Sequence, residues 1–428
     1  GGAVGVDIKA GGQLIFSGMI NADGKGTGTD ASGLALGNGG LIKLEGNGVN
    51  VSPGISTSLS ATTENATGGA VTVKVNNADL TANLFSTNVN ALHSGTAGQI
   101  NYIAPNGNVS VAGTINADGL ETANGGAITI DAKSISSSGS IARLSAAASG
   151  STGSGGEIKL VAKDADLKLG NGSTFAISFD VRGGSKSGEG GKISITNAGN
   201  LTVDGSAFTN SAARSEATVS ELSLFAAPTT HNGTLTVKSS ISVGNSQTGG
   251  AINLGAAHVV VEDNSSLTAN GSAGGGSISI DGENLDTKAL SVSIGKNVSL
   301  SADANVIKGG HGGTVRISSS DSVTIESATI NVSGVEVTAN GKSTVSTRGN
   351  LSIDAGGTFE IQNSLTGIAL GGGTSTGISL NANNWLVPGT LQLEASGEAS
   401  GTNDANGGKI SLTTNGHHLL NHGPIIHK

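Results

Sequence analysis

One short pattern recurs along the chain at nearly constant spacing, and it constrains the fold more than any other feature. A Gly-Gly pair followed by apolar residues at alternate positions begins at Gly39, Gly68, Gly125 and Gly155, and a degenerate copy begins at Ala97. The successive starts at 39, 68, 97, 125 and 155 differ by 29, 29, 28 and 30 residues. Later copies begin at Gly190, Gly249, Gly275, Gly312 and Gly407. A repeat period between about 20 and 50 residues is typical of folds built by stacking identical units.

A second signature accompanies the first and has the form apolar-x-Ala-Asp/Asn-Gly. It occurs as Ile-Asn-Ala-Asp-Gly at both 20–24 and 115–119, with looser copies at 267–271, 300–303 and 337–341. Between the signatures, β-branched residues alternate with small polar ones, as in Ile128-Thr129-Ile130. This period of two predicts short strands with one buried face, and no segment has the 3.6-residue apolar periodicity of a helix.

We therefore predict an all-β fold, a right-handed parallel β-helix with about 30 residues and three short strands per coil. Each coil would pair with the coils on either side at a spacing of about 4.8 Å. A β-sandwich would instead need turns at intervals of about 8–12 residues. We expect residues 1–415 to form a single continuous β-helical shaft with an excursion at about 206–230, where the repeat spacing lengthens. A His-containing C-terminal tail is expected over 416–428.

Composition fits this fold and excludes several others. The chain has 428 residues, of which 71 are Gly, 5 are Pro and none is Cys, and only 12% are charged. A coiled coil needs abundant Glu, Lys and Leu, and collagen needs Gly at every third position, so both are excluded. The absence of Cys removes disulfides and thiolate metal sites. A net charge of -9 argues against nucleic acid as the partner, and no apolar run is long enough to span a membrane.

The two signatures together resemble the repeats of filamentous-haemagglutinin-like adhesins of Gram-negative bacteria. The segment from Asp118 to Ala132 carries both signatures, and the likeness extends over nearly the whole chain. The resemblance implies a secreted, right-handed β-helical protein that is exported through an outer-membrane β-barrel transporter. It also implies adhesion to cells, surfaces or matrix polysaccharide. The family's secretion domain carries Asn-Pro-Asn motifs, whereas the nearest match here is Pro105-Asn106-Gly107, so we interpret the chain as a shaft segment.

The sequence offers little evidence of catalytic or metal chemistry. Its paired acids, Asp164 with Asp166, Glu262 with Asp263 and Asp281 with Glu283, are scattered, and we expect each pair at a solvated turn. The Gly-Gly-x-Gly-x-Asp pattern of calcium-binding repeats does not occur. Four of the eight His residues lie within 416–428 without an accompanying acid, so we favour a flexible tail over a metal site. We predict no catalytic residue, no metal site and no cofactor.

Irregular segments supply the only candidate binding residues. Insertions into a repeat lie on one face of a solenoid, which is often the face that binds, and the excursion at 206–230 contains Arg214, Glu216 and Glu221. A surface loop without a ligand is the alternative interpretation of this segment. Trp385 could stack on a sugar ring, although packing against a loop is the commoner role for a single Trp.

These observations lead to one preferred function and two alternatives. We expect a non-enzymatic extracellular or cell-surface adhesin, or a biofilm-matrix protein, whose rigid β-helical shaft attaches to a host or bacterial cell-surface glycan or protein. The first alternative is the structural subunit of an extracellular filament, self-associating end to end through its rod ends by strand addition. The second, less favoured, is a polysaccharide lyase or hydrolase, because β-helices serve all three roles.

Overall fold

The fold is given by a computed structural model. The described residues contain strands and turns but no helix, which confirms the predicted all-β class. The chain divides into two compact units: unit 1 comprises Gly1–Gly199 and Ser206–Val219, and unit 2 comprises Asn200–Gly205 and Ser220–Lys428. The structure describes residues 5–16, 18–24, 37–51, 57–63, 66–81, 85–111, 113–137, 142–164, 166–170, 177–204, 219–227, 232–244, 248–271, 273–282, 288–304, 310–334, 337–339, 342–344, 347–371, 377–396, 408–414, 419–421 and 425–427.

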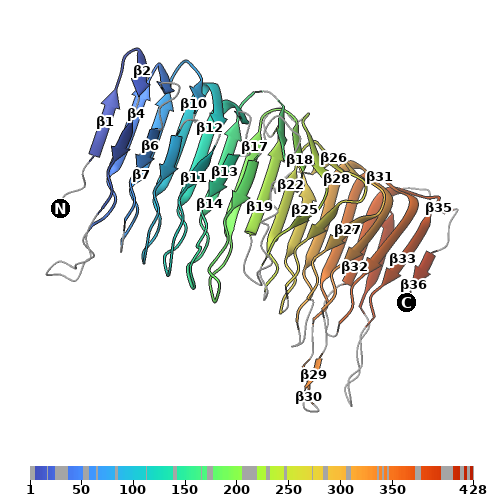
Figure 1. The fold of residues 1–428 in the computed structure, drawn as a ribbon. Coiled ribbons are helices and arrows are strands. Elements are labelled where there is room, and N and C mark those ends of the chain that lie inside the picture. The colour runs from blue at the N-terminus through green and yellow to red at the C-terminus, as the bar shows by residue number, and fades with distance from the viewer. Residues whose placement is uncertain are drawn as a thin grey trace. The chain divides into compact units, whose positions relative to one another are not determined.

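Unit 1 is built from short strands that pair in parallel with equivalent strands one repeat further along the chain (Figure 1). Its strands are β1 (Gly5–Lys9), β2 (Gln13–Phe16), β3 (Met19–Asn21), β4 (Leu41–Gly46), β5 (Gly48–Val51), β6 (Thr57–Ser60), β7 (Ala70–Val75), β8 (Leu80–Thr81), β9 (Phe85–Asn88), β10 (Gln99–Val111), β11 (Thr114–Asn116), β12 (Ala127–Ser137), β13 (Ala142–Ser145), β14 (Glu157–Ala162), β15 (Leu167–Leu169), β16 (Ile177–Asp180) and β17 (Gly191–Asn197).

The register in unit 1 follows the sequence repeat. Leu41 lies opposite Ala70, Ala70 opposite Gln99, and Gln99 opposite Ala127, so the paired positions are 29, 29 and 28 residues apart. These are the intervals between the Gly-Gly signatures. Within one repeat, β4, β5 and β6 pair in turn with β7, β8 and β9. The predicted parallel pairing of successive repeats is therefore confirmed.

Unit 2 has the same kind of parallel pairing with less regular spacing. Ala251 lies opposite Ser277, Ser277 opposite Thr314, and Thr314 opposite Asn350, at separations of 26, 37 and 36 residues. Strands β29 and β30 alone among its named strands form an antiparallel pair. Its strands are β18 (Leu201–Asp204), β19 (Val219–Ala226), β20 (Thr234–Lys238), β21 (Ile241–Ser242), β22 (Ala251–Gly255), β23 (His258–Val261), β24 (Ser266–Thr268), β25 (Ser277–Asp281), β26 (Ala289–Ile294), β27 (Val298–Ser301), β28 (Thr314–Asn331), β29 (Val337–Ala339), β30 (Lys342–Thr344), β31 (Asn350–Ile368), β32 (Gly377–Val387), β33 (Thr390–Glu394), β34 (Ile410–Thr414), β35 (Leu419–Asn421) and β36 (Ile425–His427).

Each unit has a core of stacked aliphatic side chains. In unit 1, Ile100, Ile128 and Ile158 lie opposite one another on consecutive repeats and are fully buried. Side chains alternate between inward and outward along each strand, so these β-branched residues fill the interior while their neighbours face outward. Tyr102 is also fully buried, and its hydroxyl shares a 2.5 Å hydrogen bond with Thr87.

The two sequence signatures are joined by a backbone hydrogen bond. In the repeat at 115–119, the Gly126 amide donates to the Ala117 carbonyl over 2.8 Å, and the Gly40 amide donates to Ala22 in the same way over 2.7 Å. The bond closes the bend between one repeat and the next. A Cβ added to Gly69, the second glycine of its pair, would lie 2.0 Å from the Gly40 carbonyl oxygen. Glycine is therefore required at this second position, because adjacent backbones approach too closely for any side chain.

Two segments that the sequence marked as irregular contain regular strands where they are described. Residues 205–218 and 228–231 lie outside the described residues, but Val219–Ala226 forms β19, which pairs with β22. Within 416–428, β35 pairs with Trp385–Val387 of β32, and β36 pairs with Leu391–Leu393 of β33. Apolar pairs such as Leu419-Leu420 and Ile425-Ile426, which favour strands, lie in β35 and β36.

Candidate functional site

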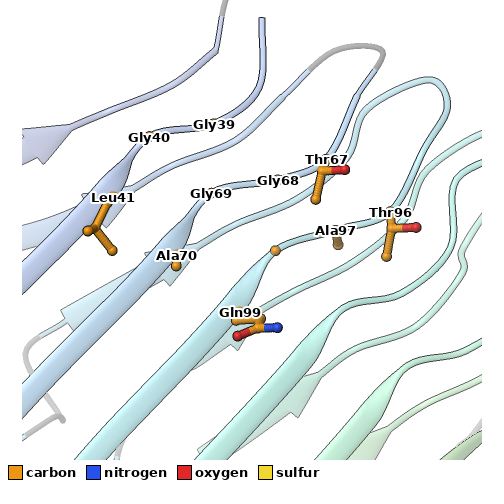
Figure 2. Close-up of a pocket in the computed structure, with 11 residues that line it drawn as sticks. Gly39, Gly40, Leu41, Thr67, Gly68, Gly69, Ala70, Thr96, Ala97 and Gln99 are labelled. Atoms are coloured by element: carbon orange, nitrogen blue, oxygen red, sulfur yellow. The ribbon is translucent and has the colours of Figure 1, made fainter. Parts of the chain in front are cut away.

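Two surface features of unit 1 are candidates for a site, and the first is a groove over the stacked Gly-Gly bends. The groove has a volume of about 370 Å³, and Figure 2 shows it crossing three successive repeats. Thr67, Thr96 and Gln99 contribute its polar side chains, and none of the described residues that line it is charged. Glycine, apolar residues and uncharged polar residues line the groove, so it contains no group for acid–base chemistry. Its lining comprises Gly39, Gly40, Leu41, Thr67, Gly68, Gly69, Ala70, Thr96, Ala97, Gly98 and Gln99.

The second feature is a cluster of charged residues around Asp180, at the end of β16. Asp180 is only 2% exposed. Its carboxylate accepts two hydrogen bonds from the Arg182 side chain, at 2.9 and 2.8 Å, and a third from Arg143 at 3.0 Å. Burial raises the pKa of Asp180, but the hydrogen bonds and charge of Arg182, with help from Arg143, outweigh it and leave the pKa below its ordinary value. Asp180 is therefore held ionised.

A second carboxyl group lies beside this ion pair. Asp118 follows β11, and its Oδ1 accepts hydrogen bonds from the Ser145 hydroxyl at 2.5 Å and from the Ala147 amide at 2.9 Å. Burial raises the pKa of Asp118, and the charge of Asp180 adds to this effect. The register brings the two together, because Asn116 lies opposite Ser145 and Ser145 opposite Asp180. We call Asn116, Asp118, Arg143, Asp180 and Arg182 the Asp180 cluster.

Unit 2 contains a buried aspartate with weaker partners. Asp281 ends β25 and is 2% exposed. Its nearest cation is Arg316, whose guanidinium lies 3.5 Å from the carboxylate. No hydrogen bond of normal geometry from the described part of the chain reaches either carboxylate oxygen. Burial raises the pKa of Asp281, and the charge of Arg316, with smaller contributions from the Gly282 backbone and the Ser318 side chain, only partly offsets it.

Two of the four predicted binding residues are described, Glu221 on β19 and Trp385 on β32. Arg214 and Glu216 lie outside the described residues. Glu221 lies on β19, where its carboxylate accepts a hydrogen bond from Ser223 at 3.4 Å. Trp385 is 3% exposed, packs edge-to-face on Phe359 with ring centroids 5.2 Å apart, and donates its indole N–H to the Thr413 carbonyl. The Trp385 ring therefore presents no open face on which a sugar could stack.

The expectation of solvated turns for the acid pairs holds for some of them and is wrong for Asp281, which is buried. Asp164 and Glu262 are well exposed and form ion pairs with Lys133 at 3.3 Å and Lys238 at 3.1 Å. Glu283 lies outside the described residues. The error at Asp281 arises because a residue type indicates a preference for solvent but not whether another segment covers it.

The isolated histidines have local partners. His93 lies 2.9 Å from the Glu121 carboxylate, and His258 and His311 each form a 2.7 Å hydrogen bond with a hydroxyl, of Ser291 and Thr347 respectively. His231, His417, His418 and His422 lie outside the described residues, as does the side chain of His427. In the described part of the chain, no three His, Cys, Asp or Glu side chains gather closely enough to hold a metal ion.

Sequence reasoning missed the Asp180 cluster entirely. The available signal was the rarity of arginine: the chain has five, and two of them, Arg143 and Arg182, contact the same carboxylate.

The described residues include no helix of the length and hydropathy needed to cross a membrane. Comparison of the chain with family models, curated proteins and solved structures gives no significant match.

Proposed function

We propose that this chain is a non-enzymatic adhesin or matrix protein that works outside the cell, in which a right-handed β-helix with three strands per coil forms a rigid shaft. The three parallel pairings of β4, β5 and β6 with β7, β8 and β9 support the three-stranded coil. The right hand follows the strong preference of parallel crossover connections. Attachment to a cell-surface glycan or protein, and export by an outer-membrane β-barrel transporter, rest on the resemblance of the repeats.

One observation carries the proposal: outward-facing residues of successive repeats form polar rows in register, and several neighbours in these rows are small and uncharged. Thr72, Asn101 and Thr129 lie opposite one another on β7, β10 and β12, and each is partly exposed. In unit 2, Ser352 and Ser379 are in register in the same way on β31 and β32. Such rows present many equivalent weak contacts, and many weak contacts made together bind strongly.

Attachment of protein-coated beads to bacterial and epithelial cells tests this function. Beads would carry the full chain at a series of surface densities, with beads coated with serum albumin as the control. We expect attachment to rise more steeply than in proportion to density, because simultaneous contacts reinforce one another. Attachment no greater than that of the albumin beads at every density would contradict the proposal. Release of reducing or unsaturated sugar ends from polysaccharide would favour an enzyme instead.

A further inference from the structure

We propose that the Asp180 cluster is a binding subsite for a neutral glycan. The inference rests on the proposed adhesive function and assigns it a location. The cluster lies on the outward face of β11, β13 and β16, where Thr114 lies opposite Arg143 and Arg143 opposite Ser178. Three successive repeats therefore contribute to one surface, as an extended ligand requires.

The cluster combines hydrogen-bond donors and acceptors on planar groups. The Arg143 side chain is 51% exposed. Its hydrogen bond to Asp180 uses one of its two terminal nitrogens, so other N–H groups of the guanidinium can donate to a ligand. Asn116 uses its amide nitrogen to donate to Asn88 at 3.1 Å, so its carbonyl oxygen stays available as an acceptor. Asp118 receives both of its hydrogen bonds on Oδ1, and Oδ2 is a second acceptor. Sugar hydroxyls both donate and accept hydrogen bonds, so they match this mixture.

Charge and polarity exclude the other main ligand classes. Two carboxyl groups, of Asp118 and Asp180, accompany the two arginines, Arg143 and Arg182, so the cluster has no excess of cationic side chains with which to attract a polyanion. The large apolar residues that are exposed in the described structure are Ile15, Met19, Leu41, Leu290 and Leu412, none of which belongs to the cluster. An apolar peptide would therefore find no anchor. A neutral, polyhydroxylated ligand is the class that remains.

The cluster is also held in place before any ligand arrives. Asp180 is buried and bound by both arginines, which fixes the Arg143 guanidinium at the surface. Ser145 and Ala147 fix the Asp118 carboxyl in the same way. A ligand therefore loses little of its binding free energy to ordering these side chains, which are otherwise costly to immobilise.

Arg316 provides a matched control in unit 2. Both Arg143 and Arg316 have side chains that are 51% exposed, and each pairs with an aspartate side chain that is 3% exposed. Arg143→Gln and Arg316→Gln therefore make the same chemical change at arginines of equal exposure, each paired with a buried aspartate.

Asp118→Asn is a second variant. The asparagine side chain has nearly the same shape as aspartate and keeps the oxygen that accepts hydrogen bonds from Ser145 and Ala147. Circular dichroism would verify that each variant is folded.

The experiment measures binding of the full chain to a printed array of neutral and acidic oligosaccharides. We expect binding to at least one neutral oligosaccharide, weakened about tenfold by Arg143→Gln and changed less than about twofold by Arg316→Gln, since tenfold corresponds to the net strength of one charged hydrogen bond. Should Arg143→Gln fail to fold, Asp118→Asn is expected to weaken the same binding.

Several outcomes would overturn the inference. These are binding to acidic oligosaccharides alone, no binding to any neutral oligosaccharide, or equal effects of Arg143→Gln and Arg316→Gln.

The bead assay is run in parallel to separate the glycan subsite from the adhesive function. Beads that attach to cells while the array shows no neutral binding would refute the subsite and leave the adhesive function standing. Neutral binding that depends on Arg143 without attachment would refute the function and leave the subsite.

Discussion

Units 1 and 2 each bury one aspartate at the end of a strand, and the two residues differ in how well they are paired. Asp180 and Asp281 are both 2% exposed, and each faces a half-exposed arginine. Asp180 has in addition the two hydrogen bonds from Arg182. The pKa consequently falls for Asp180 and rises for Asp281. Equal burial thus leads to opposite electrostatic outcomes, because hydrogen bonding decides whether a buried charge is stabilised.

The largest expected effect comes from removing the residue that distinguishes the two aspartates. Arg182→Gln would leave the buried Asp180 carboxylate with Arg143 as its cation. We expect the free energy of opening of β16 to fall by about 3 kcal/mol, since removing one partner of a buried ion pair leaves an uncompensated charge. Native-state hydrogen exchange of the β16 amides measures this local free energy.

The control for that prediction is Arg316→Gln, read from the β25 amides. Arg316 is half-exposed and 3.5 Å from its partner, so we expect a loss below about 1 kcal/mol. Equal losses at β16 and β25 would show that the Arg182 hydrogen bonds are not what sets the two aspartates apart.

Replacing each aspartate, instead of its arginine partner, tests the same difference in how well the two carboxylates are paired. Asp180→Asn removes a well-paired charge, and we expect it to destabilise β16 by about 2 kcal/mol at neutral pH. Asp281→Asn removes a buried charge that receives no hydrogen bond of normal geometry from the described residues, so we expect a change at β25 between zero and a gain of about 1 kcal/mol. The same hydrogen-exchange measurement applies to both variants. A clear loss in Asp281→Asn would mean that its carboxylate is paired in solution.

The regular part of the fold could be predicted from the sequence, whereas the Asp180 cluster could not. The Gly-Gly signature marks the start of each first strand, and the intervals of 29, 29 and 28 residues are the observed register of β4, β7, β10 and β12. The signature is readable because close approach of adjacent backbones permits only glycine at its second position, as at Gly69, Gly98 and Gly126. A steric requirement that recurs in each repeat therefore appears in the sequence as a glycine at regular intervals.

The cluster escapes prediction because it forms where the repeat lengthens. Ala142 pairs with Ile177, a separation of 35 residues, and Ser145 lies opposite Asp180. Counting back 29 residues from Asp180, the usual repeat interval, would place it opposite Ser151 and away from Arg143. The sequence does not indicate how the additional residues divide between strand and loop. The burial of Asp281 and of Trp385 likewise depends on segments that come together only in the folded chain.

Acidification is expected to shift the contributions of Asp180 and Asp281 to local stability in opposite directions. The pKa of Asp180 lies below its ordinary value near 3.8, so its stabilising contribution is present above that value and is lost as the pH falls through the folded-state pKa. The pKa of Asp281 lies above 3.8, so its contribution is present below that value and is lost as the pH rises through the folded-state pKa.

Hydrogen exchange at about pH 6 and about pH 3 would measure this difference, with each Asn variant as the reference at the same pH. Relative to Asp180→Asn, the native protein should lose stability at β16 on acidification. Relative to Asp281→Asn, it should gain stability at β25. Shifts of the same sign at both strands would contradict the opposite pKa directions.

The smallest expected effect concerns the serine that accompanies each aspartate. Ser145 lies opposite Asp180 and donates its hydroxyl to Asp118, whereas the fully buried Ser318 hydroxyl lies near Asp281 and forms no hydrogen bond of normal geometry in the described structure. Ser145→Ala should therefore cost about 1 kcal/mol at β13, the usual net value of a hydrogen bond, and Ser318→Ala should change the stability of β28 by less than about 0.5 kcal/mol. Hydrogen exchange of the two strands provides the measurement. If Ser318→Ala proved the costlier substitution, the polar groups around Asp281 would be better satisfied than those around Asp180, and the contrast between the two units would be reversed.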